Sequence, residues 1–156
     1  MPTIQDYMSG KICEQVQSAL STLETSGDSL KDTDIGKNLL NNVNKAEPKK
    51  LCIDEAITLI RGSHQCAIGE RVCRSLHKGS PFTETVFLDE LAAGMVEAGK
   101  ARFVNKSEAI DNIMTYRKQP LIVSKVSGKY SEICPTWAKK CLFWNMEKHN
   151  LKCIIR

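Results

Sequence analysis

The sequence predicts a mixed fold of the α/β or α+β class, in which an N-terminal helical arm precedes a small, helix-rich domain with a short sheet. Apolar residues recur at helical spacing over residues 5–25. Short runs rich in β-branched residues lie between helical segments in the second half of the chain. We therefore expect helices and strands to alternate from residue 83 onward, as they do in α/β crossover units.

The first part of the chain divides into a helical arm and a linker. After the helix at 5–25, Asp32-Thr33-Asp34 offers a cap for a second, short helix. Residues 41–50 are polar and rich in turn-forming residues, which is typical of a loop. The predicted division is a helical arm and linker over 1–48 and a cysteine-rich α/β domain over 51–156.

The second part alternates between the two kinds of periodicity. Apolar positions at helical spacing predict helices at 53–61, 67–77 and 83–98, and a further helix capped by Ser107. Runs of β-forming residues predict strands at 101–104, 121–126 and 151–156. Ser127-Gly128-Lys129-Tyr130 has the composition of a hairpin turn.

Two segments repeat one cysteine spacing. Cys66 and Cys73 are separated by six residues, as are Cys134 and Cys141. Four thiolates are what a tetrahedral zinc ion or a 4Fe-4S cluster requires. Cysteines seven positions apart in one helix would lie roughly 10 Å apart, so the first of each pair must stand at or before the helix N-terminus. Pro135 is favoured at the first position of a helix, which predicts Cys134 as the N-cap.

The long spacing favours an iron–sulfur cluster over zinc, because a cluster's ligands bind different iron atoms and so lie further apart. The predicted function is binding of a 4Fe-4S cluster by Cys66, Cys73, Cys134 and Cys141, with a role in electron transfer or redox sensing. Cys153 and His77 are possible substitutes in this set. Structural zinc on the same residues is the alternative, and ordinary buried thiols would also fit the pattern.

Cys134 also permits a different chemistry. A cysteine at a helix N-terminus has a lowered thiol pKa, as in dithiol redox proteins. This alternative predicts a cytosolic thiol-redox enzyme with Cys134 as the nucleophile and Cys141 or Cys153 as the resolving thiol.

Charge is unevenly distributed along the chain. The net charge is +4, and residues 117–156 carry nine basic residues against Glu132 and Glu147. Such a segment can bind an acidic redox protein or a nucleic acid, the latter as a zinc-stabilised regulator, or can simply be a solvated face. Four lysines are candidate contacts: Lys139, Lys140, Lys148 and Lys152.

Several classes of function have no support in the sequence. The chain has seven cysteines and no visible export signal, so we expect reduced thiols in the cytoplasm. No apolar run of about 18 residues predicts a membrane span. Nucleotide-binding glycine loops and the serine-hydrolase motif are also missing, so the sequence predicts no particular reaction.

Overall fold

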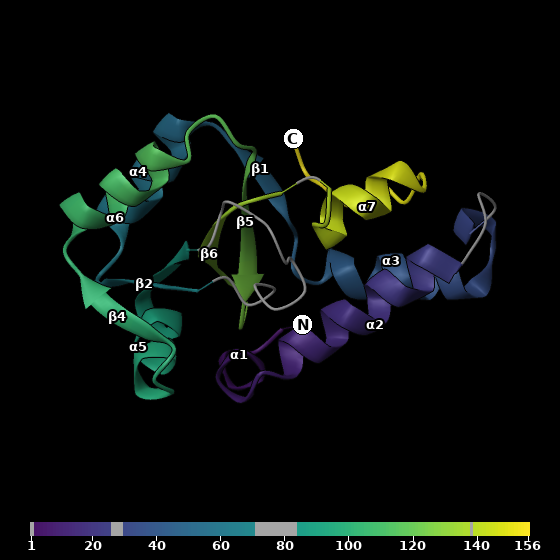
Figure 1. Cartoon of the computed structure of the whole chain (residues 1–156), viewed down its shortest axis with the longest axis horizontal. Coiled ribbons are helices and arrows are strands. Elements are labelled where there is room, and N and C mark those ends of the chain that lie inside the picture. Colours follow the sequence, from purple (N-terminus) through teal and green to yellow (C-terminus); the bar gives the residue numbers. More distant parts are fainter. Residues whose placement is uncertain (1, 26–29, 71–83, 138) are drawn as a thin grey trace.

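The protein is mixed α and β in a computed structural model that describes residues 2–25, 30–70, 84–137 and 139–156 (Figure 1). Over these residues, six strands form one sheet in the order β1-β5-β6-β3-β2-β4. The strands are β1 Lys49–Leu51, β2 Cys66–Glu70, β3 Glu84–Leu88, β4 Ala101–Val104, β5 Leu121–Val126 and β6 Lys129–Pro135. The predicted combination of helices with a short sheet is confirmed.

All neighbouring strands in this sheet are antiparallel. The expectation of α/β crossover units, which would have produced parallel strands, is therefore wrong, and the domain is of the α+β kind. The single parallel contact in the described chain is an isolated bridge between Lys49 and Ile155. The predicted C-terminal strand at 151–156 is reduced to that bridge.

The turn between β5 and β6 forms the predicted hairpin. Ser127 and Gly128 both have positive φ angles, of 53° and 85°. Two consecutive residues of this kind form the tight turn whose twist matches that of antiparallel strands. This hairpin matters for function because its strands form the centre of the surface described below.

Seven α-helices surround the described part of the sheet. They are α1 Ile4–Ser9, α2 Lys11–Thr25, α3 Asp34–Asn44, α4 Ile53–Gly62, α5 Asp89–Glu97, α6 Lys106–Thr115 and α7 Leu142–Lys148. The helix predicted over 5–25 is broken at Gly10, whose φ of 83° ends α1. Thr33 caps α3 as expected, whereas Asn105 rather than Ser107 caps α6.

Two of the predicted helices are partly wrong, because the residues expected in their first turns form strands. Residues 67–70, expected at the start of a helix over 67–77, belong to β2, and the rest of that predicted helix, residues 71–77, lies outside the described residues. Residues 84–88, expected at the start of a helix over 83–98, form β3, and only α5 remains helical. Both strands are largely buried, so their apolar residues do not alternate with polar ones. The sequence of such a strand therefore lacks the two-residue periodicity that would distinguish it from a helix.

The segment after β5 also differs from the prediction. Cys134 lies within β6, opposite Ile122 of β5, and does not cap a helix. The helix begins later, at Leu142, with Cys141 at its N-cap. The argument for Cys134 from Pro135 is therefore wrong, because Pro135 is the last residue of the strand.

The two faces of the sheet are covered by different helices. On one face, α4 and α6 pack on β-strand residues that include Cys66, Val86 and Ile133. Successive strand residues point to opposite faces. Ala67 and Phe87 therefore point to the other face, where they pack against α1, α2 and α5. Ile122 points the same way and packs with α2 and α7.

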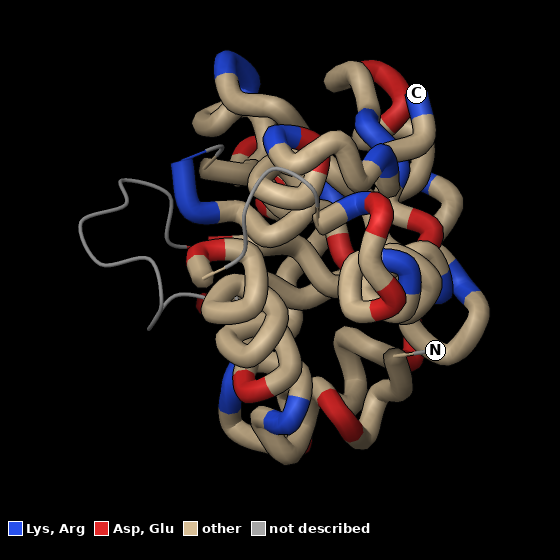
Figure 2. The backbone as a smooth tube through the Cα atoms, turned by 90° about the vertical axis from the view of Figure 1, so that its right-hand side faces the viewer, with Lys and Arg blue, Asp and Glu red and all other residues tan. Residues whose placement is uncertain are grey.

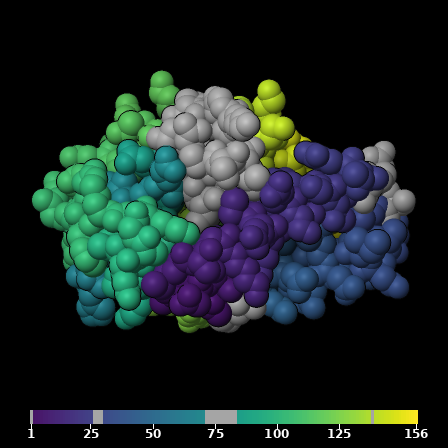
Figure 3. Space-filling view, turned by 60° about the horizontal axis from the view of Figure 1, so that its bottom comes forward, coloured from purple at the N-terminus to yellow at the C-terminus, as the bar shows by residue number. Residues whose placement is uncertain are grey.

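The N-terminal helices α1 and α2 pack along the second face of the sheet. In Figure 3, α1 and α2 run across the molecule from the segment around residue 100 to α3. Figure 1 shows α2, α3 and α7 grouped together, away from α4 and α6. No helix in the described ranges has both the length and the apolar character needed to span a membrane.

Candidate binding cavity

A cavity of about 670 Å³ lies between the second face of the sheet and helices α2, α3 and α7. Its floor is the β5–β6 hairpin, where alternation directs Ile122, Ser124, Glu132 and Cys134 to the same face. Pockets for small molecules typically measure about 300–1,000 Å³ and are mostly apolar, so this one has the size of a ligand site.

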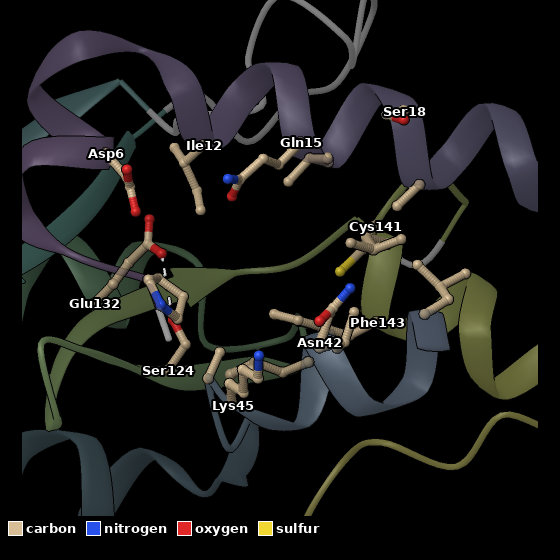
Figure 4. A pocket seen from close by; sticks show the side chains of 18 of the residues that line it. Asp6, Ile12, Gln15, Ser18, Asn42, Lys45, Ser124, Glu132, Cys141 and Phe143 are labelled. Carbon is tan, nitrogen blue, oxygen red and sulfur yellow. Dashed lines mark hydrogen bonds between the residues drawn. The ribbon is translucent and has the colours of Figure 1, made fainter. Parts of the chain in front are cut away.

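The walls of the cavity are mostly apolar. Amphipathic helices α2 and α3 face it with one stripe each, and α7 adds its first two residues. The apolar lining residues are Ile12, Val16, Ala19, Ile35, Leu39, Val43, Ala46, Ile122, Leu142 and Phe143. Figure 4 shows α2 above, the hairpin below, and α3 and α7 at the side.

Glu132 is the most distinctive side chain of the floor. It is only 6% exposed, and its Oε1 accepts a hydrogen bond of 2.8 Å from the hydroxyl of Tyr7 and one of 3.4 Å from that of Ser124. A buried carboxyl group is costly unless hydrogen bonds compensate for lost water. Hydrogen-bonded polar groups that converge in an otherwise apolar pocket are typical of a binding site, and Glu132 is such a group.

Among the residues that the structure describes, the charged side chains lining the cavity are Asp6, Lys45 and Glu132. Asp6 accepts hydrogen bonds from Thr3 in the capping box of α1, which hold its pKa below the ordinary value. Lys45, just after α3, is exposed. In Figure 4, Asp6 and Glu132 lie at one end of the cavity, whereas Cys141 and Asn42 lie at the other.

The structure brings together only some of the predicted cysteine ligands. Cys134 and Cys141 both line the cavity on the second face. Cys66 is 1% exposed and belongs to the core on the first face, beneath α4 and α6. Because Cys66 and Cys134 point to opposite faces of the sheet, the described residues give no common site for them.

Cys66 has the surroundings of a core thiol. Its Sγ contacts the carbonyl oxygen of Val104 at 3.5 Å, and burial raises its pKa. A metal site needs the thiolate, which this environment disfavours. Within the described chain, no three His, Cys, Asp or Glu side chains are grouped in a way that could hold a metal ion.

The remaining candidates are distributed as follows. Cys73 and His77 lie outside the described residues. Cys153 is buried, its Sγ lies 3.6 Å from the carbonyl oxygen of Phe143, and burial raises its pKa to about 12. The four-cysteine cluster therefore stays a prediction, and the described contacts of its members do not support it.

The basic C-terminal segment contributes to a second, smaller cavity of about 350 Å³ between α2 and α7. Lys139, Lys140 and His149 line it, opposite Glu24 of α2. On the side of the molecule that contains the C-terminus, Figure 2 shows Lys and Arg interspersed with Asp and Glu. Binding of nucleic acid or an acidic redox protein to this segment stays a prediction.

No model of a known protein family matches the chain, and neither a curated protein nor a solved structure matches it.

The main cavity was not predicted from the sequence. Its residues come from α1, α2, α3, β5, β6 and α7, and no local motif connects them. One signal was present: Glu132 is one of only two acidic residues among 117–156 and lies in a run of β-forming residues. An acidic residue on the inner face of a strand is unusual enough to mark a candidate site.

Proposed function

We propose that this protein binds a small, largely apolar molecule in the cavity between the β5–β6 hairpin and helices α2, α3 and α7. The observation that carries the proposal is a cavity of about 670 Å³ with apolar walls and a buried, hydrogen-bonded Glu132 in its floor. Apolar walls supply affinity through burial of the ligand, and a few polar groups supply orientation.

The arrangement suits a carrier or a ligand sensor. The N-terminal helices contribute both a wall of the cavity and the Tyr7 hydrogen bond to its floor. A bound molecule would therefore contact residues from both ends of the chain. Ligand binding to the folded state should raise its stability, in proportion to the logarithm of ligand concentration above the dissociation constant.

The proposal is tested with a neutral apolar dye, N-phenyl-1-naphthylamine, added to the whole protein. We expect the fluorescence of the dye to increase on binding and to reach a plateau when the cavity is saturated. Ala19→Phe places a ring in the cavity wall and should weaken dye binding about tenfold. Glu14→Phe, exposed on the same helix and outside both cavities, should change the affinity by less than about twofold. Equal effects of the two variants, with folding intact, would contradict the proposal.

One observation favours a second candidate function. Cys134 and Cys141 line the same cavity, as a thiol-redox pair would need to do. In that function, Cys134 attacks a disulfide substrate and Cys141 resolves the mixed disulfide, so that two thiols lose two protons and two electrons to the substrate. Oxidation of the native protein with glutathione disulfide, followed by peptide mass analysis, should then yield a Cys134–Cys141 disulfide. Only glutathione adducts on exposed thiols would count against it.

A 4Fe-4S cluster on Cys66, Cys73, Cys134 and Cys141, with electron transfer or redox sensing as its role, is tested separately. Anaerobically purified protein with about four iron and four sulfide per chain would establish it. Stoichiometric zinc without sulfide would favour the structural-zinc alternative.

A further inference from the structure

The second cavity, of about 350 Å³ between α2 and α7, differs in chemistry from the main one. Of the nine lining residues that the structure describes, only Leu20 and Leu23 are apolar, and the other seven carry hydrogen-bonding or charged groups. The volume lies at the lower end of the range for small-molecule pockets. A small polar molecule therefore fits this cavity better than an apolar one.

The basic groups of the second cavity come from one wall. Lys139 and Lys140 precede α7, and His149 is the C-cap of that helix. Among the residues that the structure describes, none of these three side chains forms an ion pair with a carboxylate. Hydrogen bonds between a lysine ammonium group and an anion are about twice as strong as neutral ones. This wall is therefore suited to an anionic group.

The same wall is held in place by contacts of its own. The Asn145 side-chain amide donates hydrogen bonds to the carbonyl oxygens of Lys139, at 3.4 Å, and Cys141, at 2.8 Å, which ties the chain before α7 to the helix. Lys139 Nζ lies 5.8 Å from the centre of the Trp137 ring, within the range of a cation–π contact. Groups positioned before a ligand arrives lose less entropy on binding.

The opposite wall is different, because α2 supplies Glu24 together with Gln17 and Ser21. The Glu24 carboxyl group can accept hydrogen bonds from hydroxyl groups of a ligand. It also opposes a polyanion such as a nucleic-acid strand, whose phosphates would lie along both walls. The two walls together fit a molecule with one anionic end and hydroxyl groups at the other.

The number of basic groups favours phosphate as the anion. A phosphate group carries close to two negative charges at neutral pH and three strong acceptor oxygens, whereas a carboxylate has one charge and two oxygens. Three basic side chains line this wall.

We propose that the second cavity binds a phosphate monoester that carries hydroxyl groups, such as a sugar phosphate. The phosphate lies against Lys139, Lys140 and His149, and the hydroxyl groups face Glu24. This site is separate from the main cavity and does not depend on the function proposed for it.

The test titrates the whole protein with glucose 6-phosphate, inorganic phosphate and glucose, followed by calorimetry at low ionic strength, where screening is weak. We expect glucose 6-phosphate to bind at least about ten times more tightly than inorganic phosphate, and glucose to bind most weakly. Equal binding of the two phosphates would overturn the inference, as would binding of none of the three. Tighter binding of a short single-stranded DNA would also overturn it and favour a nucleic-acid interface.

Variants assign the binding to the basic wall. Lys140→Gln should weaken glucose 6-phosphate binding about tenfold, and His149→Gln should weaken it at least about threefold. Lys118→Gln removes the same charge at an exposed position outside both cavities and should change the affinity by less than about twofold. Lys140 is exposed, so its replacement should leave the fold intact. Full affinity in both folded variants of the basic wall would overturn the inference.

A further variant tests the acidic wall. Glu24→Gln removes the charge that faces the ligand hydroxyl groups and also the repulsion of a phosphate. The preference for glucose 6-phosphate over inorganic phosphate should therefore shrink to less than about threefold. An unchanged preference would show that Glu24 does not recognise the hydroxyl groups and would overturn that part of the inference.

Discussion

Tyr7 in α1 donates a hydrogen bond of 2.8 Å to Glu132 in β6, the last of the six strands along the chain. The two residues are 125 positions apart in the sequence. Both side chains are buried. The bond therefore fixes the N-terminal helices on the sheet and holds a carboxyl group at the cavity floor. One interaction serves both the stability of the fold and the geometry of the proposed site.

Tyr7→Phe should lower the free energy of unfolding by about 1–3 kcal/mol, because it removes a donor from a buried carboxyl group. Urea unfolding followed by circular dichroism measures the change. Thr115→Val is the control, since its hydroxyl makes only a local bond to Asp111 on the exposed face of α6. A loss no larger for Tyr7→Phe than for this control would show that the bond contributes nothing to stability.

Gly69→Ala should destabilise the protein by about 1–3 kcal/mol. A Cβ at Gly69 would lie 2.3 Å from the carbonyl oxygen of Lys100, so the backbone leading into β4 would have to move. Gly62→Ala is the matched control, because a Cβ there meets nothing within 4 Å. The comparison uses midpoints of thermal unfolding. Equal midpoints for the two variants would contradict the pairing of β2 with β4.

Asp89 should make the protein sensitive to acid. Burial by itself raises its pKa, but hydrogen bonds from Lys129 Nζ at 2.5 Å and from the His64 backbone at 2.6 Å outweigh this and lower the pKa. The unfolded chain, with a carboxyl pKa of about 3.9, then takes up the proton first as pH falls. Stability from this group is therefore complete above that pH and is lost as pH falls through the lower, folded pKa.

Asp89→Asn tests this dependence, and asparagine also tolerates the positive φ of 53° at this position. At pH 7 the variant should be less stable by about 1–3 kcal/mol, and the difference should shrink toward pH 2. Asp111→Asn, an exposed residue of α6, provides the control. A difference between Asp89→Asn and the parent that stays constant from pH 7 to pH 2 would be inconsistent with the lowered pKa.

Thiol reactivity should separate the cysteines by burial. Among the six cysteines in the described ranges, Cys52 is exposed and should be alkylated first by iodoacetamide in the native protein. Cys66 and Cys153 should be alkylated last, because both are buried and burial raises the pKa of each thiol. Peptide mass analysis over time gives the order. Modification of Cys66 or Cys153 as fast as Cys52 would mean that their surroundings are open to solvent.

The parts of the fold predicted from the sequence are those set by local signals. Helix α4 has a clear apolar stripe, and the β5–β6 turn has Ser127 and Gly128 at its centre. The errors concern β2 and β3, whose short apolar runs fit either a helix or a strand. Their pairing with each other, and with β4 and β6, decides the outcome, and such distant pairing leaves no local pattern.

The same contrast between local sequence signals and distant contacts applies to the candidate site. The repeated cysteine spacing is visible in the sequence, but Cys66 and Cys134 point to opposite faces of the sheet, and strand alternation cannot be applied where a helix is expected. The cavity, by contrast, joins residues as distant as Asp6 and Glu132. No spacing relates them, so only the fold reveals that they share one site.

The most direct test of the binding cavity is a titration of the isotope-labelled whole protein with N-phenyl-1-naphthylamine, in which amide chemical shifts are followed by NMR spectroscopy. Binding in the cavity predicts that the largest shift changes occur at lining residues such as Ala19, Val43, Ser124 and Glu132. Residues such as Ala56 and Ala109, in the core on the other face of the sheet, should change little. Shift changes centred on α4 and α6, or no shift changes at a saturating concentration of the dye, would contradict the cavity as the binding site.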